Sequence, residues 1–304
     1  MKEKTVVVLG KFDGVHLGHA QLLKKAGEIS RKNAIPIVVY VISPQRNDAI
    51  TEDAEKENIL NSYGVDRVVF RTLDYKLKNM MPADFVRDIV CGELNASFVV
   101  VGENFRFGKD RCGNSNMLID LCKDIGVECF VVDTVRMVSS NGSNETVSST
   151  AIREFLKAGQ VEFAYKYLGR PYCIRGEVKH GKHLGTDMGV PTANIVPPHN
   201  SPEIRRGVYV SCVVIDGVCY RSITNVGCNP TVEEGRSLVT ETHILDANID
   251  CYGKIAEVRF IKFLRPETVF ESAEKLFKRI ESDVSEAKKF WDENPELASE
   301  IFAP

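Results

Sequence analysis

The sequence predicts an α/β protein in two parts, a parallel β-sheet covered by helices and then an antiparallel β-barrel that ends in a helix. Three observations support this prediction. Short apolar runs alternate with helical spacing in the first half, strand-like segments joined by turn residues fill the second half, and a long amphipathic pattern lies near the end. The 304 residues are long for one core and sufficient for two domains.

Five β-branched runs predict the strands of the parallel sheet. They lie at 5–9, 36–42, 66–70, 97–102 and 128–133. Because these runs are apolar throughout, each strand is expected to be buried on both faces, with right-handed crossovers between strands. Segments of helical spacing separate them, at 17–33, 52–63, 82–92 and 114–125.

The pattern changes near residue 168, which predicts domains at 1–168 and 169–304. Asp216-Gly217, between two apolar runs, predicts a β-hairpin. Strand-like segments continue without a long helical pattern between them, so an antiparallel barrel or sandwich is expected. Apolar residues at steps of three and four predict a terminal helix at about 269–293, and Asn294-Pro295 is expected to lead into coil.

Charge and cysteine content narrow the classes of function. A net charge of -3 argues against an electrostatic binder of nucleic acid. The apolar run near the N-terminus is too short for a signal peptide, and no run reaches the roughly 20 apolar residues of a membrane span. The nine cysteines form no C-x-x-C pair, so a disulfide framework or cysteine zinc site is not expected. We therefore expect a cytoplasmic protein, and its oligomeric state is left open.

The string GKFDGVHLGH, residues 10–19, follows the first predicted strand and leads into the first helix. Ligands of open parallel sheets bind at the carboxyl ends of strands, and a helix N-terminus attracts anions. Gly10 and Gly14 allow close approach of a ligand. His16 and His19, three residues apart, can donate hydrogen bonds to phosphate oxygens from one side of the first turn.

Two other interpretations of this string are open. The two histidines could hold a metal ion, as in a zinc hydrolase, although no third ligand is evident nearby. They could also be surface residues of a polar turn. The spacing is not G-x-G-x-x-G, which excludes a dinucleotide fingerprint.

The complete string resembles the H-x-G-H signature of the nucleotidylyltransferase superfamily, which implies a Rossmann-like domain. By this resemblance the two histidines are catalytic and contact ATP phosphates. A second string, SSTAIR at 148–153, is either a helix N-cap or the opposite wall of the phosphate site. The ATP-binding residues implied for this half are Gly10, Phe12, Asp13, Gly14, His16, Gly18, His19, Ser149, Thr150 and Arg153.

A third string, GENFRFGKDRCG at 102–113, follows the fourth predicted strand. Asn104 and Phe105 are placed to line the cleft, where an aromatic ring could stack on a planar ligand or belong to the core. We take these two residues as candidates for flavin binding.

The second half carries a glycine-rich segment at 175–195. It nearly spells a P-loop, but His183 stands where Ser or Thr is required and no helix follows. Thr192 and Asn194 are oxygen donors two residues apart, hence on one side of a strand, and such groups suit Mg²⁺. Glu241 and His243 likewise share one face, and a glutamate beside a bound nucleotide could accept a hydroxyl proton. Taken alone, the glycine-rich segment could be a mobile loop that ends in a Thr/Asn turn, and Glu241 could be a surface charge.

Together the strings GVPTAN, NVGCNPT, ETHILD and LRPETVF resemble those of riboflavin kinase. With the first half they resemble the bifunctional prokaryotic riboflavin kinase/FAD synthetase family over about residues 5–290. The resemblance implies a riboflavin kinase barrel, riboflavin, FMN, FAD and ATP as ligands, Mg²⁺ and no zinc, nucleic acid or membrane. It implies Glu241 as catalytic base, Arg265 as a flavin contact, Thr192 and Asn194 as metal ligands, and these nucleotide-binding residues of the kinase: Gly176, Gly181, Lys182, Gly185, Thr192 and Asn194.

Two strings depart from the family pattern. Residues 41–45 read VISPQ where F-x-P-x-P is frequent, and Val190 replaces a frequent phenylalanine. We expect both activities to survive. The alternatives are a monofunctional kinase with a regulatory nucleotide-binding N-terminal domain, and a non-catalytic RNA- or flavin-sensing protein.

Overall fold

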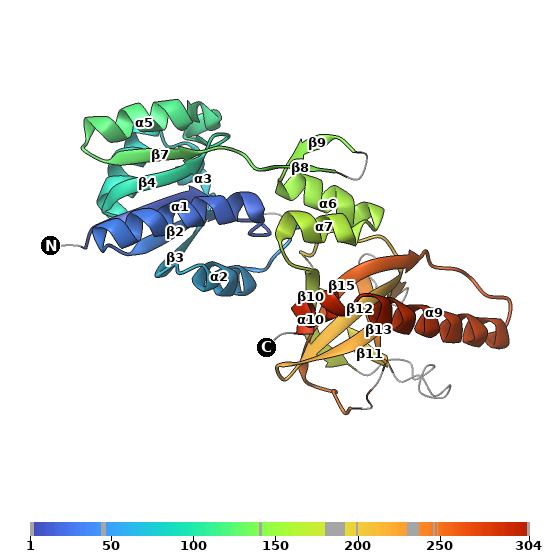
Figure 1. The fold of residues 1–304 in the computed structure, drawn as a ribbon. Coiled ribbons are helices and arrows are strands. Elements are labelled where there is room, and N and C mark those ends of the chain that lie inside the picture. Colours follow the sequence, from blue (N-terminus) through green and yellow to red (C-terminus); the bar gives the residue numbers. More distant parts are fainter. Residues whose placement is uncertain are drawn as a thin grey trace. The chain divides into compact units, whose positions relative to one another are not determined.

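The computed structural model describes residues 3–43, 47–139, 142–179, 192–198, 200–229, 237–245, 247 and 249–302. The chain divides into two compact units, Met1–Ala151 and Ile152–Pro304 (Figure 1). Each unit has its own sheet, parallel in the first and antiparallel in the second. The predicted domain boundary between residues 168 and 169 stays a prediction.

The first unit is built on a five-stranded parallel sheet, as predicted. Its strand order is β3-β2-β1-β4-β7. The order reverses beside β1, so the carboxyl ends of β1 and β4 flank the crevice in which such sheets bind ligands. The strands are β1 (Thr5–Gly10), β2 (Ile37–Ser43), β3 (Arg67–Thr72), β4 (Ala96–Gly102) and β7 (Glu128–Val132).

Helices cover both faces of this sheet. On one face, α1 (Leu17–Asn33) and α2 (Asp53–Ser62) pack with Val6, Val8 and Val39. On the other face, Val7, Leu9 and Val99 pack against another set of helices. That set is α3 (Tyr75–Lys78), α4 (Pro82–Asp84), the π-helix η1 (Phe85–Glu93) and α5 (Ser115–Asp124).

Most predicted helices of this unit are confirmed, and 17–33 matches α1 at both ends. The segment predicted at 82–92 is π-helical over most of its length. Short elements that no pattern predicted complete the unit: β5 (Arg106–Phe107), η2 (Lys109–Arg111), β6 (Gly113–Asn114), β8 (Arg136–Val138) and β9 (Asn144–Thr146).

The second unit is a closed antiparallel barrel, which confirms the barrel prediction. The strand order is β10-β11-β14-β13-β12-β15, and β15 pairs with β10 to close it. The strands are β10 (Tyr172–Lys179), β11 (Thr192–Ile195), β12 (Gly207–Ile215), β13 (Val218–Asn229), β14 (Ser237–Ile244) and β15 (Ile255–Arg265). The helices α6 (Ser149–Ala158) and α7 (Val161–Leu168) precede it.

The predicted hairpin joins β12 to β13. Asp216 and Gly217 have φ of 51° and 79°, as a two-residue type I′ turn requires. Inside the barrel, the hydroxyls of Ser211, Ser222, Thr224 and Thr242 form a hydrogen-bonded chain with separations of 2.8–2.9 Å. These four buried hydroxyls therefore satisfy one another within the core.

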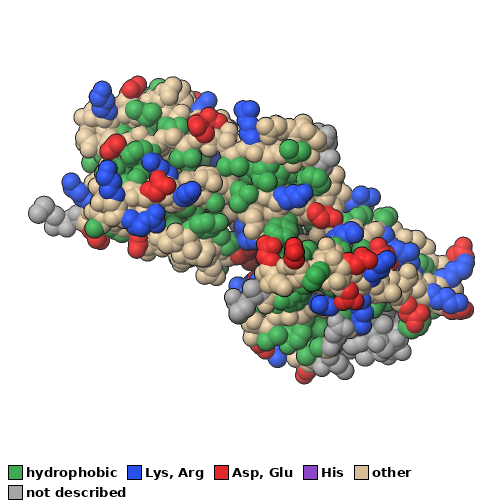
Figure 2. All heavy atoms as spheres, in the orientation of Figure 1, with side chains coloured by type: hydrophobic (Ala, Val, Ile, Leu, Met, Phe, Trp, Pro, Cys, Tyr) green, Lys and Arg blue, Asp and Glu red, His purple; other side chains and the backbone are tan. Residues whose placement is uncertain are grey.

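Two helices end the chain, α9 (Ala273–Glu293) and α10 (Pro295–Phe302). The first begins later than predicted because Ser272 Oγ accepts a hydrogen bond from Lys275 N–H and caps it. The coil predicted after Asn294 was wrong, because proline is well tolerated at the first position of a helix. Trp291 and Ile301 pack together over the outer faces of β12 and β13. Figure 2 shows acidic and basic side chains interspersed on the face in view.

Candidate active sites

The turn after β1 has an unusual backbone. Phe12 and Val15 have φ of 51° and 39°, in the left-handed region that bulky residues avoid. Both side chains are buried in the core between the sheet and α1. The strain is therefore held by packing, which is the usual situation at a functional turn.

His16 and His19 lie side by side at the start of α1. Their rings are stacked, with centroids 3.8 Å apart and an interplanar angle of 18°. The backbone N–H of His16 donates a hydrogen bond to His19 Nδ1 at 3.2 Å. Because Nδ1 accepts, a neutral His19 carries its proton on Nε2, where it can be donated to a ligand.

Two glycines of the string are required by close approach. A Cβ on residue 18 would lie 3.0 Å from His16 Cε1, and a Cβ on residue 10 would lie 2.9 Å from Phe12 Cε2. Each glycine therefore makes room for a ring of the turn. The presence of glycine at positions 10 and 18 therefore has a structural explanation that does not depend on a ligand.

Asp13 connects the turn to two other segments. Its carboxylate accepts a hydrogen bond from Ile50 N–H at 2.8 Å, and its carbonyl accepts one from Ser149 Oγ at 2.8 Å. The N–H of Gly14 donates to Thr51 Oγ1 at 3.2 Å. The structure thus brings Ser149 to the histidine turn, as expected, and adds Thr51, which the sequence did not indicate.

The string SSTAIR caps a helix and also reaches the histidine turn, while its contact with ATP phosphates stays a prediction. Ser148 Oγ accepts a hydrogen bond from Ala151 N–H at 3.2 Å and caps α6, while Ser149 contacts Asp13. Thr150 is exposed on α6. Arg153 belongs to the second compact unit, and its approach to the ATP phosphates stays a prediction.

Asn104 and Phe105 follow the carboxyl end of β4, the strand beside β1. Asn104 is exposed, and Phe105 stacks on Phe107 with ring centroids 5.6 Å apart. Phe105 also packs against the core. Nearby, Glu103 accepts hydrogen bonds from the side chain and backbone of Thr134, which lower the pKa of the Glu103 carboxyl.

The second site is a row of polar residues on the outer face of the barrel. Asn194 lies opposite Glu241, and Glu241 lies opposite Asn225 on the next strand. Thr192 lies opposite His243 in the same way. The alternating residues, including Ala193, Thr240 and Thr242, are buried in the barrel. Opposite residues have Cβ atoms about 5 Å apart, so the row is one continuous surface.

The side chains of this row fit Mg²⁺. A hydroxyl, an amide oxygen and a carboxylate are the hard oxygen donors that this ion prefers together with water and substrate phosphates. In the described part of the chain, no group of three or more His, Cys, Asp or Glu residues is placed to hold a metal.

The predicted kinase flap is described only at its start. A Cβ on Gly176 would lie 2.9 Å from the carbonyl oxygen of Val196, so the glycine allows β10 to pass close to the end of β11. Gly181, Lys182, Gly185 and Val190 lie outside the described residues.

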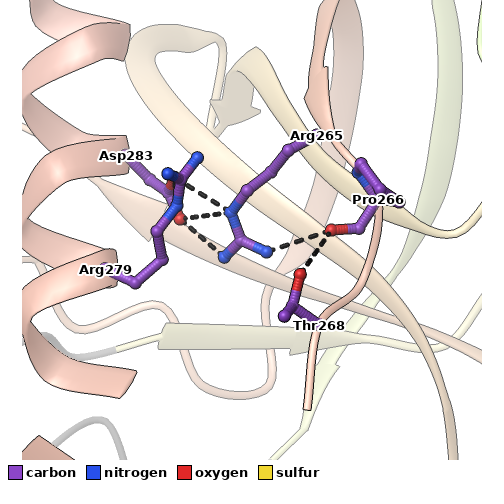
Figure 3. Close-up of polar contacts among 5 residues, drawn as sticks. All are labelled: Arg265, Pro266, Thr268, Arg279 and Asp283. Carbon is purple, nitrogen blue, oxygen red and sulfur yellow. Dashed lines mark hydrogen bonds and ion pairs between the residues drawn. The ribbon is translucent and has the colours of Figure 1, made fainter. Parts of the chain in front are cut away.

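Arg265 is held by a buried ion pair at the end of β15. Its Nε and Nη2 donate to the carboxylate of Asp283 on α9 at 2.7–3.0 Å, and its Nη1 donates to the carbonyl of Pro266 at 3.0 Å (Figure 3). The predicted contact of Arg265 with flavin stays a prediction.

A paired-histidine turn at the switch point of a parallel sheet, and an oxygen-donor row on a closed barrel, define a two-unit transferase that handles phosphates. Comparison with known families agrees with this class. Residues 1–151 match the family model of FAD synthetase, and residues 168–291 match that of riboflavin kinase.

Relatives match over the full length of the chain. Bifunctional riboflavin kinase/FMN adenylyltransferases from Escherichia coli and Pseudomonas fluorescens are 32% and 33% identical to it, over 95% and 93% of this chain and 94% and 92% of theirs. A crystal structure described as a macrolide-efflux protein from Streptococcus pneumoniae has a TM-score of 0.85 at 30% identity, over 95% of both chains. The chain belongs to the bifunctional riboflavin kinase/FMN adenylyltransferase family.

The predicted family and the predicted pair of activities are thereby confirmed. The protein is a transferase with riboflavin kinase and FMN adenylyltransferase activities. Its substrates and products are riboflavin, ATP, FMN and FAD. None of the helices in the described ranges is long and apolar enough to cross a membrane.

Proposed function

We propose that the row of polar residues on the outer face of the barrel catalyses phosphorylation of riboflavin. The turn that carries His16 and His19 then catalyses adenylylation of the resulting FMN. One observation carries this assignment: in each unit, polar residues from separate strings of the sequence converge at one place. Asn194, Glu241 and Asn225 lie in register. At the turn after β1, His16 and His19 stack and Ser149 donates a hydrogen bond to the carbonyl of Asp13.

In the kinase step, the 5′-hydroxyl of the ribityl chain attacks the γ-phosphate of ATP. The new bond joins the hydroxyl oxygen to phosphorus, the bond from phosphorus to the β,γ-bridging oxygen breaks, and ADP leaves. Glu241 accepts the hydroxyl proton. Thr192 and Asn194 hold Mg²⁺, which neutralises phosphate charge when it is bound. The glycines at 176, 181 and 185 and Lys182 bind the phosphates.

In the adenylyl transfer step, a phosphate oxygen of FMN attacks the α-phosphate of a second ATP. The bond between the α-phosphorus and the bridging oxygen breaks, which releases pyrophosphate and gives FAD. His19 donates its Nε2–H and His16 lies against it, so the pair stabilises charge on the transferring group. Ser149, Thr150 and Arg153 bind the leaving phosphates, and neither histidine needs to transfer a proton.

The remaining assignments complete the proposal. Asn104 and Phe105 contact the flavin of FMN, and Arg265 contacts riboflavin. We also propose a cytoplasmic location, where ATP is available and where the described cysteines, none of which is in a disulfide, stay reduced.

Product analysis tests the proposal. Purified protein is incubated with riboflavin, ATP and Mg²⁺, and FMN and FAD are resolved over time. FMN is expected first and FAD after it, and a chelator should stop both. If FMN, ATP and Mg²⁺ give no FAD, the alternative of a monofunctional kinase is correct.

A further inference from the structure

The ion pair between Arg265 and Asp283 belongs to a larger cluster between the end of β15 and the first half of α9. Asp283 is only 2% exposed, and Arg279 Nε lies 2.9 Å from its carboxylate (Figure 3). The guanidinium of Arg265 also lies 5.9 Å from the centre of the Phe270 ring. A buried carboxylate shared by two cations has a fixed geometry, because moving it would leave a charge uncompensated.

This cluster anchors the segment 266–269, which joins β15 to α9. All four residues are exposed, and Val269 is 98% exposed. The Pro266 carbonyl accepts hydrogen bonds from Arg265 Nη1 at 3.0 Å and from Thr268 Oγ1 at 3.5 Å. The segment is therefore held at its base by Arg265, and Arg265 is held by Asp283.

The anchored segment brings a second carboxylate to the barrel row. Glu267 Oε1 lies 2.7 Å from the point that a Cβ on Gly227 would occupy, and Asn225 Nδ2 lies 3.7 Å from the same point. Asn225 is opposite Glu241 in the strand register. Glu267 thus extends the row of Asn194, Glu241 and Asn225 by one more acceptor.

We propose that Glu267 accepts a hydrogen bond from a hydroxyl of the riboflavin side chain, and that Asp283 is the positioning residue that places it. This rests on the proposed role of Glu241 at the neighbouring position. The ribityl chain carries several hydroxyl donors, and an ionised carboxylate is an acceptor only. Glu241 takes the proton of the reacting hydroxyl, and Glu267 binds another hydroxyl of the same chain.

Two substitutions test the inference, with steady-state kinetics of FMN formation as the measurement. Glu267→Gln keeps the shape and removes the charge, and its KM for riboflavin is expected to rise about tenfold, the effect of one hydrogen bond to a charged group. Its kcat and its KM for ATP should stay nearly constant. Glu271→Gln is the matched control, because Glu271 is an exposed carboxylate of the same connection that pairs with Lys275.

Asp283→Asn should raise the KM for riboflavin in the same way, and Asp283→Glu, which restores the charge, should recover part of it. The double variant Asp283→Asn/Glu267→Gln should be no worse than the more impaired single variant, since both act through one carboxylate. The KM for ATP in FMN formation, which should stay nearly constant, reports whether the barrel of each variant is folded.

An unchanged KM for riboflavin in Glu267→Gln would overturn the inference. This variant tests the role of Glu267 even if Asp283→Asn does not fold. Asp283→Asn that loses stability but keeps its KM would reduce Asp283 to a structural residue. The proposed function is tested separately by Glu241→Ala. If that variant keeps full kinase activity, the assigned base is wrong, whereas an inactive Glu241→Ala with a normal Glu267→Gln refutes only this inference.

Discussion

The backbone N–H of His16 donates a hydrogen bond to the ring of His19, and the two rings are stacked 3.8 Å apart. The start of α1 and the orientation of the second imidazole are therefore one geometric unit. A change at either residue moves the other, so their contributions to catalysis should not be additive.

His16→Ala should lower FAD formation by about 10²–10³-fold, the cost of losing one preorganised donor. FMN formation should stay close to that of the unmodified protein, because the barrel has its own site. The two rates are measured separately, one from riboflavin and one from supplied FMN. An equal loss of both activities would contradict the division of labour between the units.

Gly18→Ala should reduce FAD formation about tenfold through misplacement of His16, since the new Cβ would lie 3.0 Å from its ring. Gly27→Ala on the same helix is the control. A Cβ there meets only Arg31 Nη1, at 3.6 Å, so that substitution should stabilise α1 by about 1 kcal/mol. Adenylyl transfer rates and thermal unfolding midpoints of the two variants give the comparison.

Glu241→Gln should lower the kcat of FMN formation by about 10²–10⁴-fold, the usual contribution of a general base. FAD formation from supplied FMN should not change. Glu177→Gln, which removes an exposed carboxylate from β10 of the same barrel, should leave both rates intact. A Glu241→Gln protein with a normal kcat would require a different proton acceptor.

Ala34→Gly should raise the free energy of unfolding by about 1 kcal/mol. Ala34 ends α1 with φ 52° and ψ 47°, a conformation that glycine adopts without steric cost. Ala158→Gly is the opposite case, because Ala158 is exposed but helical, and it should lose about 0.5–1 kcal/mol. Denaturant unfolding of both variants measures whether the free energy of unfolding rises in the first and falls in the second.

Glu162→Gln should stabilise the protein more at pH 7 than at pH 4. Burial raises the pKa of the Glu162 carboxyl above its ordinary value, so the folded protein binds this proton more tightly than the unfolded chain. The stability from that proton is complete below the unfolded pKa of about 4.3 and is lost as pH rises through the folded pKa. Unfolding midpoints measured between pH 4 and 8 test this pH dependence. Glu154→Gln, which removes an exposed carboxylate, controls for the loss of one charge.

The elements with strong periodicity were predictable from the sequence, and those that depend on local backbone chemistry were not. The apolar spacing of 17–33 gave both ends of α1. The same kind of spacing at 82–92 could not reveal a π-helix, because apolar periodicity tolerates one extra residue per turn. Pro295 was interpreted as a helix terminator, whereas at the first helical position its missing N–H costs nothing.

The sites show a similar division. Alternation along one strand predicted that Glu241 and His243 share a face, but their neighbours follow from the register of the barrel. Asn225 was missed for this reason, and Glu267 was missed because its position depends on the connection between β15 and α9. The contact of Asp13 with ATP stays a prediction, and the hydrogen bond that its carboxylate accepts from Ile50 N–H was not predicted. The positive φ of Phe12 was not predictable, since it contradicts the local preference of an aromatic residue.

Closure of the barrel has a further consequence for how the protein behaves in a crowded solution. A strand with neighbours on both sides offers no free backbone on which a foreign strand can grow, so the β10–β15 closure protects this unit from edge-to-edge aggregation. The five-stranded sheet of the first unit has open margins instead. At one of them, β3 carries exposed Arg67 and Arg71, charges that discourage a second chain from docking there.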